Sequence, residues 1–302
     1  MSSNTEISLP FFGLISDNIN YANLCALGIP WSASSSYRDG ADHGPTFIRS
    51  ATSGVLYNTF TEMGLNLKEK WQIYDPGNLQ INSNNPLEVR NSILEQIKSV
   101  NRYGMKYFFM GGDHLSTYFT FWSLKQLEES SRVGIIYLDA HPDLYDSYNG
   151  NKHSHACVLR RIIEDTHIDP TNVIQVGIRA ATPEQSSFAQ KVGIKTITTK
   201  EFLQNGSEQT AEIVKGNLPN NLEKIYISID LDVLDPAFAP GVGNPQPGGL
   251  TTRDLMNFIQ NLYGLKINAF DIVELCPKID YSGITAFASA MLIKEMLGII
   301  QK

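Results

Sequence analysis

Acidic and histidine side chains gather in two short strings of this 302-residue chain. The first string is DAHPDLYD, which begins at Asp139, and the second is SIDLDVLDP, which contains Asp230 and Asp232. Successive side chains of an extended segment point to opposite faces, so Asp139, His141 and Asp143 share one face. For the same reason Asp230 and Asp232 lie on one side of their own segment. Carboxylate and imidazole groups delivered together in this way predict a metal site.

A third string, GGDH, ends at His114 and precedes both others in the chain. Four ionised aspartates beside two neutral histidines would be severely destabilising without partners, and two divalent cations would neutralise them. This donor set suits Mn, while Ni, Co, Fe and Zn are also chemically possible. Two such ions about 3.5–4 Å apart can share a bridging water and lower its pKa, which supplies hydroxide near neutral pH. The predicted ligands are His114, Asp139, His141, Asp143, Asp230 and Asp232.

Apolar runs predict the elements that position these side chains. About eight strands are expected, near residues 24–29, 71–75, 106–110, 133–138, 172–177, 194–198, 224–229 and 267–273. Helical stretches separate most of them. One helix should begin at Asn85-Pro86, and another at Thr251, which forms a capping box with Asp254. This alternation predicts an α/β fold, with one domain over residues 1–302 and a mainly parallel sheet between two helical layers.

In such sheets ligand sites lie beyond the carboxyl ends of the strands. Three of the predicted strands run directly into GGDH, Asp139 and Asp230, so their polar residues should meet in one crevice. A single aspartate after a strand more often caps a helix or shapes a turn. We therefore expect structural roles of that kind for Asp113, Asp146 and Asp235.

From about Gly28 to Ile300 the chain resembles the ureohydrolases, the family of arginases, agmatinases, guanidinobutyrases and formiminoglutamases. The strings GGDHLST, DAHPDLYD and SIDLDVLDPAFAPGVGNPQPGG carry this resemblance, and the six predicted ligands fall on the family's metal-ligand positions. The resemblance implies an arginase/deacetylase-like fold and two Mn²⁺ ions per subunit. It also implies hydrolysis of a guanidino group to urea and an amine by a metal-bridging hydroxide. The resemblance also suggests a homo-oligomer, either a trimer or a hexamer. The cytoplasmic location that we expect follows instead from the three cysteines, which have no CxxC spacing and cannot all pair internally.

The same resemblance assigns catalytic and substrate-binding residues. Glu274, in DIVEL, matches the glutamate that holds the guanidinium, and a carboxylate can accept two parallel hydrogen bonds from that planar group. His155, in NKHSHACV, matches a histidine near the departing amine that shuttles a proton or orients a group. We expect the neighbouring His153 to have no such role. Asp143 is expected to accept the proton of the hydroxide and to pass it to the amine.

Departures from the arginase pattern bear on the substrate. Arginases grip the amino acid end of arginine with residues whose positions are Tyr145 and Thr182 here, and a loop serine is replaced by Asn151. SYRDGA followed by GPTFIR resembles the agmatinase branch, and GNKHSHACVLRRI resembles prokaryotic, particularly archaeal, agmatinases. The expected substrate is therefore agmatine, a small cation cleaved to urea and putrescine, with Asn151 as a further substrate contact. Aminopropylagmatine, guanidinobutyrate, arginine and formiminoglutamate stay open as alternatives.

Composition excludes several other classes. Lys and Arg number 24 against 31 Asp and Glu, which disfavours nucleic-acid binding. The apolar segment from Gly283 is interrupted by Lys294 and Glu295, which favours a buried or subunit-facing helix over a membrane span. The three cysteines have no CxxC spacing and are expected to be reduced.

Two alternatives to a binuclear ureohydrolase remain, a deacetylase-like hydrolase with a single zinc and a non-catalytic metal-binding homologue.

Overall fold

One parallel sheet of eight strands forms the centre of the computed structural model, which describes residues 9–128 and 131–301. The strand order is β2-β1-β3-β8-β7-β4-β5-β6, and every neighbouring pair is parallel. The strands are β1 (Leu24–Gly28), β2 (Ile73–Tyr74), β3 (Lys106–Met110), β4 (Val133–Leu138), β5 (Val173–Ile178), β6 (Lys195–Thr198), β7 (Lys224–Asp230) and β8 (Ile267–Val273). All eight predicted strands are confirmed, with boundaries that differ by no more than a few residues.

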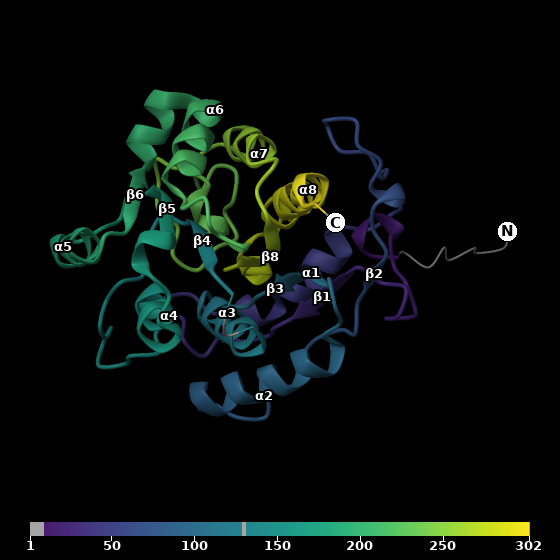
Figure 1. Cartoon of the computed structure of the whole chain (residues 1–302), viewed down its shortest axis with the longest axis horizontal. Coiled ribbons are helices and arrows are strands. Elements are labelled where there is room, and N and C mark those ends of the chain that lie inside the picture. The colour runs from purple at the N-terminus through teal and green to yellow at the C-terminus, as the bar shows by residue number, and fades with distance from the viewer. Residues whose placement is uncertain (1–8, 129–130, 302) are drawn as a thin grey trace, which may run out of the picture.

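Helices cover both faces of this sheet (Figure 1). The helices are α1 (Gly44–Ala51), α2 (Pro86–Val100), α3 (Leu115–Leu127), α4 (Val158–Thr166), α5 (Pro183–Val192), α6 (Thr199–Asn217), α7 (Thr252–Asn261) and α8 (Ile284–Ile299). Alternate strand side chains enter different cores: Ile136 belongs to the core that includes residues of α1, α6, α7 and α8, whereas Ile135 belongs to the core that includes residues of α2, α3, α4 and α5. The predicted single-domain, three-layer α/β fold is confirmed.

The predicted helix starts are also present. The side chain of Asn85 accepts a hydrogen bond from the backbone N–H of Leu87, and Pro86 is the first residue of α2. Thr251 and Asp254 form a reciprocal capping box at the start of α7. These contacts satisfy backbone N–H groups that have no partner within the helix.

The apolar C-terminal segment forms α8, and most of its side chains are buried within the domain. Lys294 lies over the rings of Phe12 and Tyr57, and Glu295 accepts a hydrogen bond from the backbone of Glu62. The prediction of a buried helix is confirmed. In the part of the chain that the structure describes, no helix has the length and apolarity needed to cross a bilayer.

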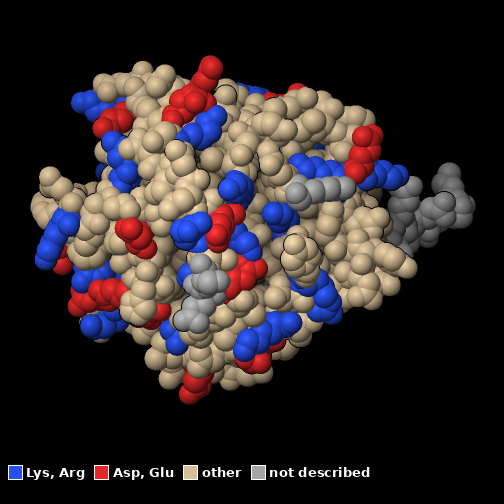
Figure 2. All heavy atoms as spheres, in the orientation of Figure 1, with Lys and Arg blue, Asp and Glu red and all other residues tan. Residues whose placement is uncertain are grey.

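Basic and acidic side chains are interspersed over the face drawn in Figure 2. The three cysteines, Cys25, Cys157 and Cys276, are free and buried, as expected of reduced thiols.

Candidate metal centre and substrate pocket

Four neighbouring strands at the middle of the sheet carry the predicted site residues on their carboxyl ends. β3 leads into the turn that ends at His114, and β4 is followed at once by Asp139. β7 ends at Asp230 itself, and β8 is followed by Glu274. Because β3, β8, β7 and β4 are adjacent in that order, these side chains meet at one edge of the sheet.

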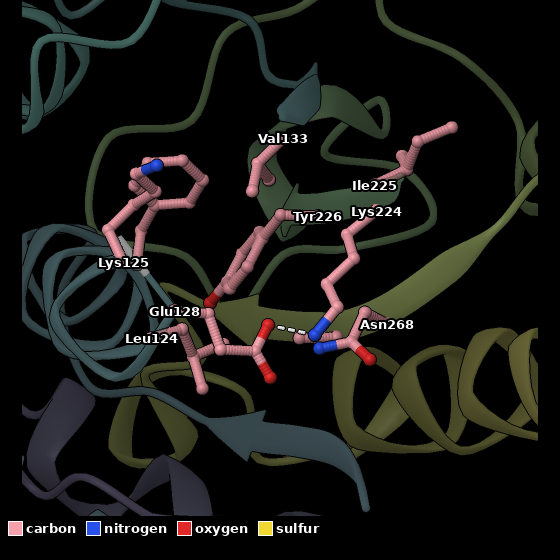
Figure 3. A pocket seen from close by; sticks show the side chains of 10 residues that line it. Leu124, Lys125, Glu128, Val133, Lys224, Ile225, Tyr226 and Asn268 are labelled. Atoms are coloured by element: carbon pink, nitrogen blue, oxygen red, sulfur yellow. Dashed lines mark hydrogen bonds and ion pairs between the residues drawn. The ribbon is translucent and has the colours of Figure 1, made fainter. Parts of the chain in front are cut away.

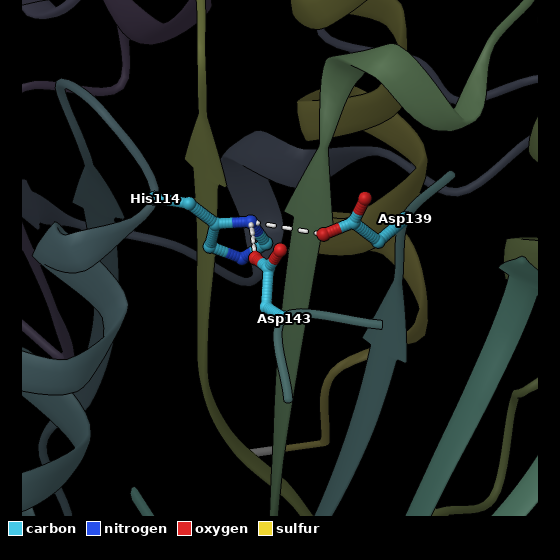
Figure 4. Close-up of side chains that lie close together, drawn as sticks. All are labelled: His114, Asp139 and Asp143. Atoms are coloured by element: carbon cyan, nitrogen blue, oxygen red, sulfur yellow. Dashed lines mark ion pairs between the residues drawn. The ribbon is translucent and has the colours of Figure 1, made fainter. Parts of the chain in front are cut away.

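The predicted ligands converge on two neighbouring positions. Nδ1 of His114 lies 3.0 Å from Oδ2 of Asp139 and 3.4 Å from Oδ2 of Asp143 (Figure 4). The same nitrogen lies 3.0 Å from Oδ2 of Asp230. Nδ1 of His141 lies 2.9 Å from Oδ2 of Asp232 and 3.5 Å from Oδ1 of Asp139. Potential ligand atoms lie close together in two sets, one from His114, Asp139 and Asp143 and the other from Asp139, His141 and Asp232, so Asp139 belongs to both. Its carboxylate can therefore be shared by two adjacent cations.

Backbone hydrogen bonds orient three of the carboxylates. Oδ1 of Asp139 accepts from the backbone N–H of His141 at 2.6 Å, and Oδ1 of Asp230 accepts from that of Asp232 at 2.7 Å. Oδ1 of Asp232 accepts from the backbone of Ala140 at 3.1 Å. In each case one oxygen is fixed by the backbone and Oδ2 faces a histidine of the cluster.

The charges of the cluster perturb one another strongly. Burial lowers the pKa of His141, but Asp232 and Asp139 raise it to about 12. Burial likewise lowers the pKa of His114, but the adjacent carboxylates of Asp139 and Asp230 raise it well above its ordinary value. Burial and the charge of Asp139 raise the pKa of Asp143 to about 8. Without cations the cluster therefore retains protons that bound cations would replace.

The residues present fit a pair of divalent cations. Oδ2 of Asp139 is buried and accepts no hydrogen bond from the described residues, although Nδ1 of His114 is 3.0 Å away. A buried carboxylate oxygen of this kind needs a partner, which a cation supplies. Four carboxylates and two imidazoles are also the donor types that Mn²⁺ and related ions accept.

Beside this cluster lies a cavity of about 170 Å³. Its lining is Ser36, His114, His141, Asp143, Tyr145, Tyr148, His155, Ala156, Ala180, Gln185, Asp230, Asp232, Asn244 and Glu274. Five of the six predicted ligands and both predicted partners of the guanidino group, Glu274 and His155, are therefore brought together.

A second cavity, of about 20 Å³, lies near the amino ends of β4, β7 and β8 beside the ion pair of Lys224 and Glu128 (Figure 3). It has room for about one water molecule.

Glu274 offers the cavity one free oxygen. Its Oε1 accepts hydrogen bonds from the backbone N–H of His114 at 2.9 Å and from Nδ1 of His155 at 2.8 Å. Its Oε2 is buried and has no hydrogen-bond partner among the residues described here. Burial raises the pKa of Glu274, but the neighbouring His155 outweighs it and the pKa is lowered. The carboxylate is therefore charged and has an acceptor available for a guanidinium N–H.

Two of these site residues adopt left-handed backbone conformations. Asp143 has φ 51° and Glu274 has φ 66°. Such values are uncommon outside glycine, and they persist only where the surroundings fix them. Oδ2 of Asp143 accepts a hydrogen bond from the Tyr137 hydroxyl at 2.8 Å, and the backbone N–H of Glu274 donates to the carbonyl of Gly112 at 2.8 Å.

Of the remaining predicted residues, His155 lines the cavity and Asn151 lies outside it. His155 is buried; burial lowers its pKa, but Glu274, with Asp113 and Asp143, raises it to about 9. Asn151 is exposed, its side chain accepts from the backbone of His153, and it does not line the cavity. Its proposed contact with substrate would need a substrate that extends beyond the cavity.

Aspartates expected to be structural make structural contacts. Oδ1 of Asp113 accepts from the backbone of Leu115 at the start of α3, and its Oδ2 accepts from Ser34. Asp235 accepts from the backbone of Gly248 and Gly249 and so shapes the Gly/Pro-rich loop. Asp146 pairs instead with two basic side chains, the buried Arg161 and the exposed Lys152.

Sequence reasoning missed several residues of the pocket lining. Ser36, Tyr148, Gln185 and Asn244 all line the cavity. Ser36 begins the string SYRDGA and Asn244 lies in the string SIDLDVLDPAFAPGVGNPQPGG, but the sequence analysis gave neither residue a role. Tyr145, one of the departures from the arginase pattern, is also in the lining.

Comparison with known proteins agrees with this geometry. The family described as the Arginase family matches residues 22–298 of the chain. The chain belongs to the arginase family. It is 34% identical to a guanidinopropionase of Pseudomonas aeruginosa over 90% of this chain and 84% of that protein. The predicted ureohydrolase family is thus confirmed.

Two solved structures of the arginase family extend the comparison. Proclavaminate amidino hydrolase from Streptomyces clavuligerus has a TM-score of 0.86 and 27% identity, and the match covers 96% of this chain and 95% of that one. Agmatine ureohydrolase of Thermoplasma volcanium has a TM-score of 0.80 and 29% identity, over 97% and 94% of the two chains. These relatives are named for different guanidino substrates, so family membership does not fix the substrate.

Proposed function

We propose that this arginase-family enzyme hydrolyses agmatine to urea and putrescine. The observation that carries the proposal is the composition of the cavity: its described lining contains carboxylates, histidines and uncharged side chains but no Lys or Arg. A substrate with a carboxylate at its far end would find no Lys or Arg in this lining to pair with it, which is unfavourable. Agmatine is positive at both ends and suits this lining.

The two arginines near the pocket do not alter this charge balance. Arg38 donates from Nε to the carbonyl of Gly243 at 3.0 Å and from its terminal nitrogen to that of Val242 at 2.7 Å. Arg179 donates to several backbone carbonyls, including that of Asp232 at 2.6 Å. Both guanidinium groups are held by the loops that surround the site, so neither is presented to a substrate carboxylate.

The predicted pair of Mn²⁺ ions would be held by the six ligand residues. When bound, such ions neutralise the clustered carboxylates and activate water as a nucleophile. The reaction adds the oxygen of water to the guanidino carbon, breaks the bond from that carbon to the alkyl nitrogen and delivers both protons of water to that nitrogen. The products are urea and the protonated amine.

The side chains of this protein have three tasks in that reaction. Oε2 of Glu274 accepts an N–H of the guanidinium and fixes the orientation of its plane. The carboxylate of Asp143, in the cavity lining, takes the proton released from water and carries it to the departing amine. His155 donates from Nδ1 to Glu274 and holds this acceptor in place, with assistance to proton transfer as its second task.

A panel assay tests the proposal. Urea release by Mn-loaded protein would be measured with agmatine, aminopropylagmatine, guanidinobutyrate, arginine and formiminoglutamate, and kcat/KM compared. We expect agmatine to lead. A lead for arginine or guanidinobutyrate would contradict the charge argument, and no urea from any compound would favour a non-catalytic homologue.

The matched variant for this assay is Glu274→Gln, which preserves size and removes the charge. A hydrogen bond to a charged group contributes about 1.5–3 kcal/mol, so kcat/KM should fall about 10- to 100-fold or more. Unchanged kcat/KM in this variant would remove Glu274 from substrate binding.

A further inference from the structure

The loop formed by residues 32–40 reaches into the site through one hydroxyl group. Oγ of Ser36 lies 2.7 Å from Nε2 of His155, and the backbone N–H of Ser36 lies 3.1 Å from the same nitrogen. Nδ2 of Asn244 donates to Oγ of Ser36 at 3.0 Å. On the other side of the ring, Nδ1 of His155 is 2.8 Å from Oε1 of Glu274. Asn244, Ser36, His155 and Glu274 therefore form one hydrogen-bonded chain.

The carboxylate of Glu274 determines which groups donate and which accept in this hydrogen-bonded chain. A carboxylate only accepts, so Nδ1 of His155 carries a proton and donates it to Glu274. The backbone N–H of Ser36 donates to Nε2, so this nitrogen is an acceptor and the Ser36 hydroxyl donates to it as well. The ring is thus held at both nitrogens.

Backbone contacts fix the loop that carries Ser36. The backbone N–H of His155 donates to the carbonyl of Ser34 at 3.2 Å, and the backbone N–H of Ser34 donates to Oδ2 of Asp113 at 2.8 Å. The indole N–H of Trp31 donates to Oγ of Ser34 at 2.7 Å. Since Asp113 directly precedes His114, the loop, the His155 segment and the predicted metal centre are linked.

We propose that Ser36 is a positioning residue for guanidinium binding. Its hydroxyl, oriented by Asn244, holds the ring of His155 so that Nδ1–H fixes Oε1 of Glu274 and leaves Oε2 as the acceptor for substrate. The inference rests on the proposed role of Glu274, but it does not depend on which guanidino compound is cleaved.

The test uses the guanidinium ion as the probe, with Mn-loaded protein and titration calorimetry. Ser36→Ala should weaken guanidinium binding about tenfold, because the buried ring of His155 loses a partner. Ser36→Thr keeps the hydroxyl and should restore most of the affinity. Ser35→Ala is the matched control, since Oγ of Ser35 has no hydrogen-bond partner in the described part of the chain, and it should bind as the unmodified protein does.

A double-mutant cycle separates positioning from direct contact, because Ser36 also lines the cavity. In a His155→Ala background, Ser36→Ala should change guanidinium affinity less than twofold. With a substrate that releases urea, Ser36→Ala should raise KM more than it lowers kcat. An undiminished effect in the His155→Ala background, no effect of Ser36→Ala alone, or failure of Ser36→Thr to restore binding would overturn the inference.

Glu274→Gln, measured in the same titration, keeps this inference distinct from the proposed function. If guanidinium binding depends on Glu274 but not on Ser36, only the positioning role is wrong. If Glu274→Gln binds as well as the unmodified protein, or if the unmodified protein shows no saturable binding, both the role of Glu274 and the positioning role of Ser36 are overturned. Failure of agmatine alone as a substrate leaves the calorimetric result standing.

Discussion

Replacing Ser228 with alanine should weaken metal binding although Ser228 is not itself a ligand. Oγ of Ser228 lies 3.0 Å from Nε2 of His114 and donates to Oδ1 of Asp271 at 2.8 Å. Nδ1 of His114 faces the aspartates, so it must be unprotonated to hold a cation, and the proton must then be on Nε2. The hydroxyl oxygen of Ser228 accepts a hydrogen bond from this Nε2–H, and its own O–H donates to the buried carboxylate of Asp271.

The expected magnitude follows from the burial of these groups. His114 is 1% exposed and Asp271 is 1% exposed, so water does not replace the lost hydroxyl. Removing a partner that orients a metal-binding histidine typically weakens metal affinity about 10- to 100-fold, which is about 1.4–2.8 kcal/mol. In the metal-free protein, the unsatisfied donor should also lower the free energy of unfolding by about 1–3 kcal/mol.

The assay is competition between protein and a chelator for Mn²⁺, with denaturant unfolding of the metal-free protein in parallel. Ser123→Ala is the matched control, because Ser123 is buried in α3 and its Oγ has no hydrogen-bond partner in the residues that the structure describes. Metal affinity of Ser228→Ala equal to that of the unmodified protein would refute the reasoning, whatever its stability.

Two further predictions concern backbone packing and pH. An ideal Cβ on Gly112 would lie 1.8 Å from the carbonyl oxygen of Trp31, so Gly112→Ala should displace the His114 turn and reduce both stability and metal content. An ideal Cβ on Gly216 in α6 would have no atom within 4 Å, so Gly216→Ala should instead raise the free energy of unfolding by about 0.5–1 kcal/mol. Thermal unfolding checks both variants, and equal effects of Gly112→Ala and Gly216→Ala would contradict this prediction. Burial raises the pKa of Asp280, but hydrogen bonds from Ser282 and from the backbone N–H of Thr285 in the first turn of α8 outweigh it, and the pKa is lowered. Ionised Asp280 therefore makes its full contribution to the free energy of unfolding at neutral pH, and this contribution is lost as pH falls through the lowered pKa. Asp280→Asn should lower the free energy of unfolding of the metal-free protein at pH 7, and the difference from the unmodified protein should shrink below about pH 4. Denaturant titrations at several pH values measure this difference. A loss of stability that does not change with pH, or an equal loss in the exposed control Asp17→Asn, would show that the ionised carboxylate of Asp280 is not its cause.

The strands could be predicted because parallel strands covered on both faces are continuous apolar runs. KIYISI, for example, is followed by Asp230, and β7 ends at that residue. The ligands could be predicted because residue spacing places them at strand ends. The sequence did not reveal that β3, β8, β7 and β4 would be neighbours, because pairing between distant segments leaves no local pattern.

The supporting residues were missed for two different reasons. Ser36 is 119 residues from His155, in the polar run SASSSYR, where no periodicity separates one serine from another. Asp271 did have a signal that went unused, because a carboxylate within the apolar strand INAFDIV must find buried partners. Those partners are the hydroxyls of Tyr226, Thr117 and Ser228.

The left-handed backbone at Asp143 and Glu274 has a consequence for protein engineering. At these φ values glycine would relieve the local conformational strain, so a library screened for thermal tolerance alone should enrich glycine at both positions. Each such gain would delete a proposed catalytic or substrate-binding carboxylate. Stabilisation of this protein by consensus or computational redesign should therefore hold both positions fixed, because a more robust fold and a working catalyst demand different residues there.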